Sequence, residues 1–486
     1  MHHNTKTSKM RDMKKLYLLI ILLFFLWTNI KSQSCLPEGI NFTTQEAIDN
    51  FQTDYPGCTQ IEGNVLISGT EINNLDGLSI VNSIGGTLRL YQNSSLNSLV
   101  GLENLDSIGG SLYIDENDAL TNLVGLESLS NAGDWIKIYD NENLESLNGL
   151  QSVVNIPEYI HIQGNNSLTS LNGLNNLNAI HFSLQVSFNN SLKTLTGLEG
   201  LESIGGNLTI DNNHELNSLS GLTNLDTING SLVIGHTDSL INLQGLNNLT
   251  SIGGLLSIYA NSSLKNLTGL NNLKNIGAYF ELLSNESLTS IFGLDSLHTI
   301  GDHLIIKYND SLIELSSLEK LISIGGTLEI SNNSVLNNLN GLDNIDASSI
   351  ESLWVMNNSK LSTCEVQSIC DYLINQNGTK RIENNAEGCN NQNEVVEQCE
   401  ANSVNEGKPS PMFTIYPNPA TNRIYITSSM KNYIHEINVL NQFGQLQVHK
   451  EHETNSINTS NLKPGVYYIN IISENLNFRE KFVISR

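Results

Sequence analysis

A 24-residue repeat runs through the middle of the chain and limits what it can fold into. Its marker is a glycine that recurs at 77, 101, 125, 149, 173, 197, 221, 245, 269, 293 and 341, and Ser317 fills the single gap, so twelve copies follow one another without an insertion. Leucine follows this position in every copy. Because a unit this short can bury its apolar side only against copies of itself, the pattern predicts a solenoid.

The consensus of one unit, G-L-x-x-L-x-x-I-G-G-x-L-x-I-x-x-N-x-x-L-x-x-L-x, indicates strands rather than helices. Its L-x-I pair has the period of two that is typical of a short strand with one face inward. The other apolar positions are three apart, but the central glycine and the many Asn, Ser and Thr residues disfavour a helix. We therefore expect an all-β, parallel β-solenoid of about twelve turns over residues 66–356, with capped ends.

An asparagine recurs at one position of nearly every copy, from Asn93 to Asn333, and Thr237 is the exception. We interpret this column as an inward ladder, in which side-chain amides bond neighbouring turns and corner backbone groups that would otherwise be unsatisfied. Glycosylation is the competing interpretation where the sequence reads N-x-S/T.

The repeat resembles the leucine-rich repeat superfamily through L-x-I-x-x-N-x-x-L followed by G-L, and it resembles the receptor L-domain more closely. That module is a right-handed β-helix found in insulin-receptor-type ectodomains and fungal wall proteins. The resemblance covers about residues 60–360 and implies the architecture, with a right-handed solenoid, but not the ligand.

The six cysteines form two clusters, and in an exported protein an even count predicts disulfides. Cys35 and Cys58 are the economical first pair, whereas Cys364, Cys370, Cys389 and Cys399 allow three connectivities. The clusters lie in the predicted caps, residues 33–65 and 357–400. The stretch that begins at Cys364, CEVQSICDYLINQNGT, has the one clear helical pattern in the chain.

Residues 1–32 are typical of a secretory signal peptide: MKKLYLLIILLFFLW, from residue 13, places two lysines before a short apolar run, and small or polar residues follow. The formal net charge is −25, which disfavours nucleic acid as a partner.

Residues 401–412 are expected to be a linker, and the six alternating apolar stretches after it predict a small Ig-like antiparallel β-sandwich over residues 413–486. This tail resembles the C-terminal sorting domain (type A) of the Bacteroidota type IX secretion system through YPNPA, LNQFGQ, LKPGVYYINI and the terminal KFVISR. The resemblance implies recognition by the secretion translocon and removal by a sortase-like peptidase. The motif residues are Tyr416, Pro417, Asn418, Pro419, Gly444, Pro464, Gly465 and Tyr467.

The sequence offers no catalytic constellation, metal site or cofactor motif. Histidine is sparse in the repeats, and the carboxylates of DENDAL and DNENL lack the glycine and final glutamate of an EF-hand loop. The Gly-Gly pairs recur in the repeat frame with no helix after them, so they are turn glycines and not phosphate cradles.

Aromatic side chains gather on the outward positions of the first strands, which makes this surface the candidate ligand site. Aromatics also favour strands in general, so the concentration has a purely structural interpretation as well. The residues are Tyr91, Tyr113, Trp135, Lys137, Tyr139, Tyr159 and His161, with Tyr259 and Tyr279 as a weaker second group.

These features together predict a non-catalytic binding or adhesion protein, secreted or held at the cell surface of a Bacteroidota bacterium, that recognises a glycan or a surface protein. The alternative is a structural or spacer protein of the surface layer with no specific ligand.

Overall fold

The fold is described from a computed structural model over residues 33–375, 378–403, 413–428, 434–451, 456–473 and 476–485. The predicted signal peptide, residues 1–32, lies outside the described residues, as does most of the predicted linker. The chain divides into two compact units, one formed by residues up to 192 with 196–200 and the other by 193–195 with the rest of the chain from 201.

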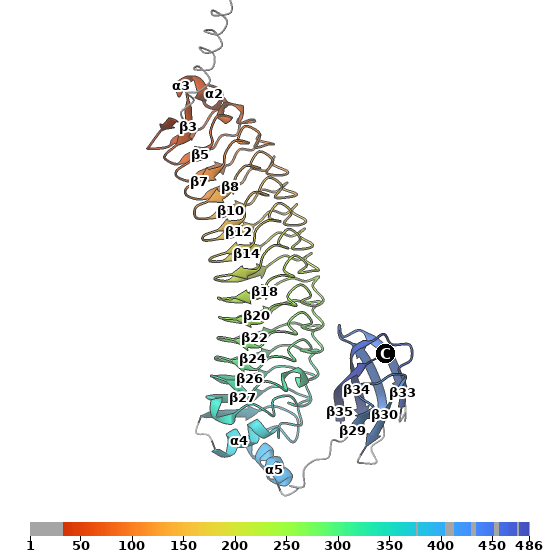
Figure 1. Ribbon diagram of the computed structural model, residues 1–486. Helices are drawn as coiled ribbons and strands as arrows, with labels where there is room; N and C mark the ends of the chain where they lie inside the picture. Colours follow the sequence, from red (N-terminus) through yellow and green to blue (C-terminus); the bar gives the residue numbers. More distant parts are fainter. Residues whose placement is uncertain are drawn as a thin grey trace, which may run out of the picture. The chain divides into compact units, whose positions relative to one another are not determined.

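One parallel sheet receives one strand from each turn of the repeat (Figure 1), which confirms the predicted parallel β-solenoid. In most of the repeats neighbouring strands pair 24 residues apart, so that Ile136 lies between Leu112 and Ile160. The sheet has fifteen strands instead of the twelve expected turns, because the flanking segments add strands of their own. The first unit holds β2 (Ile40–Phe42), β4 (Val65–Ile67), β6 (Leu88–Tyr91), β8 (Leu112–Asp115), β10 (Ile136–Tyr139), β12 (Ile160–Gln163) and β14 (Leu184–Ser187). The second holds β16 (Leu208–Asp211), β18 (Leu232–Gly235), β20 (Leu256–Tyr259), β22 (Phe280–Leu283), β24 (Leu304–Lys307), β26 (Thr327–Ser331), β27 (Ser352–Met356) and β28 (Thr379–Glu383).

A second series of very short parallel strands precedes the Gly-Gly corners. It consists of β1 (Gln33–Cys35), β3 (Cys58–Ile61), β5 (Ser83–Ile84), β7 (Ser107–Ile108), β9 (Asn131–Ala132), β11 (Asn155–Ile156), β13 (Ala179–Ile180), β15 (Ser203–Ile204), β17 (Thr227–Ile228), β19 (Ser251–Ile252), β21 (Asn275–Ile276), β23 (Thr299–Ile300) and β25 (Ser323–Ile324).

The repeated leucines and isoleucines fill the interior, and nearly all of them are fully buried. The repeat glycine is needed where its φ is positive: Gly149 has φ +123°, and a Cβ there would overlap the carbonyl of Leu123 in the preceding turn. Ser317 is tolerated at the same position because it lies in a 3-10 turn, η2 (Ser316–Leu318), and has no positive φ.

The asparagine column forms the predicted ladder. Asn141 is fully buried, and its Nδ2 donates to Ile114 O (2.9 Å) and to Asn165 Oδ1 (3.1 Å) one turn further. Each amide therefore satisfies a corner carbonyl and links two turns, which secures the end of every strand in the same way.

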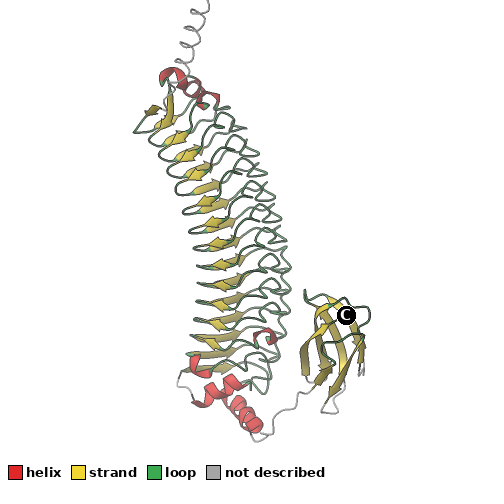
Figure 2. Cartoon of the chain, viewed as in Figure 1, coloured by secondary structure: helices red, strands yellow, loops and turns green. Residues whose placement is uncertain are grey.

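Among the residues that the structure describes, the α-helices lie in the segments that flank the repeats (Figure 2). They are α2 (Gln45–Asp49), α3 (Phe51–Asp54), α4 (Gln367–Asn375) and α5 (Gln392–Ser403), and the remaining 3-10 turns are η1 (Asp76–Leu78) and η3 (Ala347–Ser349). Helix α4 occupies the stretch whose pattern predicted a helix. Three disulfides close these segments: Cys35–Cys58, Cys364–Cys389 and Cys370–Cys399.

The C-terminal residues form two antiparallel sheets with their own apolar core, from Phe413 to Ile484. One sheet is ordered β29 (Phe413–Tyr416), β30 (Arg423–Ser428), β33 (Ser456–Asn458), and the other β32 (Leu446–Glu451), β31 (Ile434–Asn441), β34 (Gly465–Ser473), β35 (Leu476–Ile484). The sequence patterns predict all of these strands except β33, whose three residues are too few to show an alternating pattern.

Candidate functional site

Parallel in-register pairing gathers outward side chains of the first unit into columns, with about 4.8 Å between strands. In the central column Arg89, Tyr113, Lys137 and His161 are successive neighbours on β6, β8, β10 and β12. The structure thus brings together the seven residues that the sequence singled out. We call the resulting surface the Lys137 face, which comprises Arg89, Tyr91, Tyr113, Asp115, Trp135, Lys137, Tyr139, Tyr159 and His161.

The Lys137 ammonium occupies the middle of this face, among three aromatic rings. Its Nζ lies 3.9 Å from the ring centre of Trp135, 5.3 Å from that of Tyr113 and 5.9 Å from that of Tyr139. Partial burial lowers the pKa of Lys137, and the nearby Asp115 carboxylate opposes that shift. The side chain is thus held by cation–π contacts and forms no ion pair with a described residue.

Asp115 forms an ion pair with Arg89, and neither residue was among the predicted site residues. Arg89 Nε is 2.9 Å from Asp115 Oδ2, and the guanidinium stacks over Tyr91 at 4.5 Å. Asp115 is only 6% exposed, and among the described residues its second oxygen, Oδ1, accepts no hydrogen bond. Burial raises the pKa of this carboxyl, and the charge of Arg89 offsets part of the rise.

The rings of the Lys137 face also contact one another in two groups. Trp135 and Tyr159 have ring centres 4.5 Å apart, Tyr159 is 5.5 Å from Phe182, and the Trp135 indole donates to Glu158. Phe182, half exposed, extends this row by one turn and was not predicted.

Tyr139 and His161 contact each other edge to face, with ring centres 4.6 Å apart, and the Tyr139 hydroxyl hydrogen-bonds His161 Nδ1. Burial, together with the Asp115 charge, raises the pKa of Tyr139 to about 12. Burial and the positive charge of Lys137 lower the pKa of His161 to about 4, so His161 is neutral at physiological pH.

A cavity of about 550 Å³ opens on the Lys137 face. Of the predicted residues, Tyr113, Lys137 and Tyr139 line it, whereas the other four lie beside it. Six further lining residues were not predicted from the sequence. A signal for one of them was present, since residues 33–192 contain only two Lys or Arg side chains, two repeats apart at one repeat position. The six are Asn64, Val65, Leu66, Thr87, Arg89 and Asp115.

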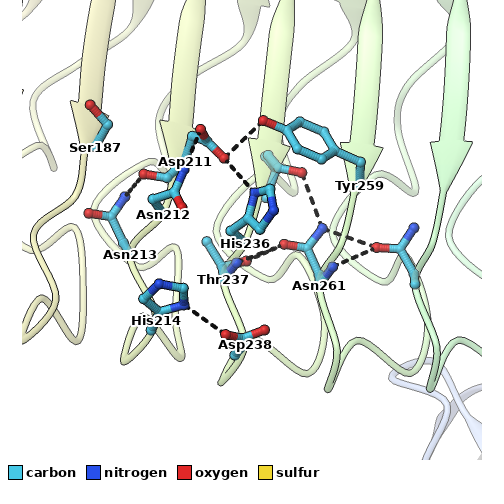
Figure 3. A network of polar contacts seen from close by, with 12 residues as sticks. Ser187, Asp211, Asn212, Asn213, His214, His236, Thr237, Asp238, Tyr259 and Asn261 are labelled. Atoms are coloured by element: carbon cyan, nitrogen blue, oxygen red, sulfur yellow. Dashed lines mark hydrogen bonds and ion pairs between the residues drawn. The ribbon is translucent and has the colours of Figure 1, made fainter.

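A second polar cluster lies on the second unit, around Asp211 (Figure 3). Asp211 Oδ1 accepts hydrogen bonds from the Tyr259 hydroxyl (2.9 Å) and from His236 Nδ1 (3.2 Å), and Oδ2 accepts one from Asn212 (2.7 Å). Burial, followed by the hydrogen bond to Asp211, raises the pKa of Tyr259 to about 12. Both carboxylate oxygens of Asp211 therefore have partners within the protein.

Gly235 makes this cluster possible. Tyr259 reaches Asp211 two turns earlier by laying its ring across Gly235 in the intervening turn. A Cβ at Gly235 would overlap that ring and lie 2.7 Å from Asp211 Oδ1. We interpret the Asp211 cluster as a self-satisfied surface network, in contrast to the Lys137 face.

The sorting-motif residues hold together the turns of the C-terminal sandwich. Asn418 accepts a hydrogen bond from Val483 N (3.0 Å), and the hydroxyl of buried Tyr467 donates to Lys463 O (2.9 Å). Gly444, with φ +73°, closes the turn between β31 and β32. Tyr416 is half exposed and stacks on Tyr425, next to Pro417 and Pro419.

Two of the four sorting motifs also meet in space. A cavity of about 500 Å³ in the C-terminal domain is lined by residues 441–443, 445, 447 and 461–467, which include Pro464, Gly465 and Tyr467. LNQFGQ and LKPGVYY therefore contribute to one surface, although sixteen residues separate them in the sequence.

Within the described ranges, no group of three or more His, Cys, Asp or Glu side chains is arranged to hold a metal ion. None of the helices in that part of the chain combines the length and the apolar character that crossing a bilayer requires.

Two segments of the chain match known families. Residues 57–144 match the family described as Receptor L domain, and residues 414–485 match the family described as Secretion system C-terminal sorting domain. No curated protein sequence matches the chain. The sorting domain indicates export to the cell surface or the medium and implies interaction with the type IX secretion machinery, and the disulfides are consistent with an extracellular location. The Receptor L domain match contains all the residues that line the cavity on the Lys137 face.

Proposed function

We propose that the chain is a non-catalytic binding protein of the cell surface or the medium, and that the Lys137 face is its ligand site. In this proposal residues 33–400 form the binding body with its caps, and residues 413–486 form the domain that directs export. The signal peptide over residues 1–32 and a Bacteroidota source belong to the same proposal.

One observation carries the proposal: the cavity contains two charged groups, each of which lacks one partner within the described part of the protein. Lys137 takes part in no ion pair with a described residue, and Asp115 keeps a buried oxygen without a donor. An unsatisfied buried acceptor costs about 1–3 kcal/mol, so a native structure that retains one needs an explanation. A ligand hydroxyl or amide that reaches Asp115 Oδ1 after a small side-chain shift supplies the missing donor.

The Asp211 cluster supports this interpretation by comparison. It occupies the same repeat positions and also combines a carboxylate with a tyrosine, yet protein donors satisfy both its carboxylate oxygens. The repeat can thus complete such a cluster internally, and at Asp115 it does not.

The composition of the Lys137 face suits recognition of a glycan or a surface protein. Ligand sites typically combine apolar and aromatic walls with a few polar groups that fix orientation, in cavities of about 300–1,000 Å³. Aromatic and arginine side chains are also the residues that most often dominate binding energy at protein interfaces.

A binding screen tests the proposal. The wild-type protein and a Trp135→Ala/Tyr139→Ala variant are applied to a glycan array and to a panel of surface proteins, and Tyr259→Ala serves as a control that removes an aromatic ring from the Asp211 cluster. We expect a specific signal that the double variant loses and the control keeps, at equal thermal stability of the repeat body. Equal binding by all three proteins would exclude the Lys137 face as the site.

The alternative is a structural or spacer role without a specific ligand. The observation in its favour is that the aromatics are half buried by contacts with one another, as in Trp135 against Tyr159. This role predicts that no probe in the screen is bound and that substitutions at Trp135 and Tyr139 leave export and surface retention unchanged.

A further inference from the structure

The Lys and Arg side chains of residues 33–192 are confined to the Lys137 face. Residues 33–192 contain eighteen Asp and Glu side chains and only two Lys or Arg side chains, Arg89 and Lys137. Both of these cations line the same cavity. The acidic surface repels anions elsewhere on this unit, so the cavity is the place where a negatively charged group is attracted.

Arg89 is held ready for such a group. Its Nε is engaged by Asp115, and its guanidinium rests on the Tyr91 ring, so its orientation is fixed from two sides. Its side chain is nevertheless 47% exposed, and no hydrogen bond from its terminal nitrogens to another described residue is formed. A planar guanidinium whose two terminal NH2 groups are free matches the geometry of a carboxylate.

Lys137 lies one strand beyond Tyr113 on the same wall and contributes the second charge. Aromatic rings surround its ammonium but give it no counter-ion. An incoming carboxylate supplies that counter-ion in a partly desolvated setting, where ion pairs are less screened by salt than at an open surface.

The remaining walls favour a sugar as the bearer of the carboxylate. Tyr113 and Tyr139 contribute aromatic side chains to the lining, and Asn64 and Thr87 add short polar side chains. A pyranose ring offers apolar C–H faces for aromatic contact and hydroxyls at its edge for hydrogen bonds, including one to Asp115. An acidic peptide offers the charge but lacks this alternation of apolar face and hydroxyl edge.

We infer that the ligand of the Lys137 face is a glycan that carries uronic-acid-type sugars, whose carboxylate pairs with Arg89 and Lys137 while the sugar ring packs on Tyr113 and Tyr139. This inference rests on the proposed function and names the class of ligand for the same site.

The test is a calorimetric titration of the full-length protein with galacturonate, glucuronate and mannuronate oligosaccharides, each compared with its own methyl ester. The ester keeps the rings and hydroxyls and replaces the charged carboxylate with a neutral methyl ester. We expect at least one acidic oligosaccharide to bind, its ester to bind about tenfold more weakly or worse, and the affinity to fall as salt is raised.

Lys137→Gln is expected to reduce the affinity about tenfold, and Lys137→Arg is expected to retain most of it. Lys265→Gln removes the same charge from an exposed lysine outside the face and is expected to change nothing. For Arg89→Gln the unfolding temperature is measured together with the affinity, because this substitution also leaves the buried Asp115 without its ion pair.

Failure to bind any of the three acids, or equal binding of acid and ester, would overturn the inference. The binding screen then decides on the proposed function by itself. Binding of a neutral glycan or a protein that depends on Trp135 and Tyr139 would support the proposed function. Absence of any such binding would overturn the proposed function as well.

Discussion

Two aspartates at the same position of the repeat, Asp115 and Asp211, have different surroundings. Asp211 is enclosed by protein donors because Gly235, one turn on, lets Tyr259 reach back to it. Asp115 has Tyr139 at the corresponding next strand, and that ring turns to His161 instead. The two aspartates thus differ in the residues one and two turns on, which are Gly235 and Tyr259 after Asp211 and Tyr139 and Gln163 after Asp115.

Gly235→Ala is expected to destabilise the second unit by about 1–3 kcal/mol, because its Cβ would overlap the Tyr259 ring. Gly235 has no positive φ, so backbone strain does not contribute. Denaturant unfolding of the single and double variants measures the effect. In a Tyr259→Ala background most of the penalty should disappear, and a penalty that persists there would show that the ring is not its cause.

His161 predicts a pH dependence of stability. Its pKa is lowered from 6.5 to about 4 in the folded protein, so between these values the unfolded chain binds the additional proton. This contribution to stability is present above pH 6.5 and is lost as the pH falls toward 4.

The prediction is checked by comparing the unfolding temperatures of the wild type and His161→Gln from pH 7 to pH 4.5, because the difference between them cancels groups that titrate in both. The advantage of the wild type should shrink as the pH falls. A difference that stays constant with pH would contradict the lowered pKa.

At the scale of single elements, the asparagine ladder explains why every turn can end its strand in the same way. Asn261 donates from Nδ2 to Ile234 O and to Asn285 Oδ1. Thr237 breaks the column: its hydroxyl donates to Asn261 Oδ1 (2.6 Å), but threonine has no second donor for a corner carbonyl. The ladder is therefore continued at this turn with one hydrogen bond fewer.

Thr237→Asn is expected to stabilise the repeat body by about 1 kcal/mol, since it restores the missing donor. The reciprocal change, Asn285→Thr, should destabilise it by about 1–3 kcal/mol through loss of the bonds to Ile258 O and Leu283 O. Denaturant unfolding checks both variants. If the two substitutions shifted stability in the same direction, the ladder would not be the reason for the asparagine column.

The strands and the ladder could be predicted because each is written many times in one frame, so a local pattern of period two or 24 is enough. Helix α4 could be predicted from its apolar face, whereas α5 and the short α2 and α3 could not, because their apolar faces are brief and their burial depends on the end turns they contact. The pairing of the last four cysteines could not be predicted either, because it depends on how α4 and α5 lie relative to each other in the folded chain.

The candidate site shows the same limit. The aromatic residues were evident from their concentration, but the role of Arg89 and Asp115 depends on a contact between adjacent turns that only the folded register establishes. These opposite charges lie on adjacent strands, 26 residues apart in the sequence, and so carry no local sequence signature, although the scarcity of basic residues around them was visible.

At the scale of the whole molecule, the proposed function places export and binding in different parts of the chain. The sorting-domain match covers residues 414–485, and the cavity on the Lys137 face is lined by residues 64–139. The two activities should therefore be separable.

A chain that lacks residues 413–486 is expected to remain inside the producing cell while keeping its binding activity. The fraction of protein at the surface and in the medium, measured by immunoblotting of cell fractions, checks the first part, and titration of the purified truncated chain checks the second. Normal export without the tail would contradict the assignment of the sorting domain.

The most direct test of the central claim compares Tyr113→Ala, which opens the cavity of the Lys137 face, with Tyr259→Ala, which opens the Asp211 cluster, in one glycan and surface-protein binding profile. We predict that Tyr113→Ala loses the specific signal of the wild type and that Tyr259→Ala retains it. A signal that survives Tyr113→Ala, or that is lost instead in Tyr259→Ala, would contradict the placement of the ligand site on the Lys137 face.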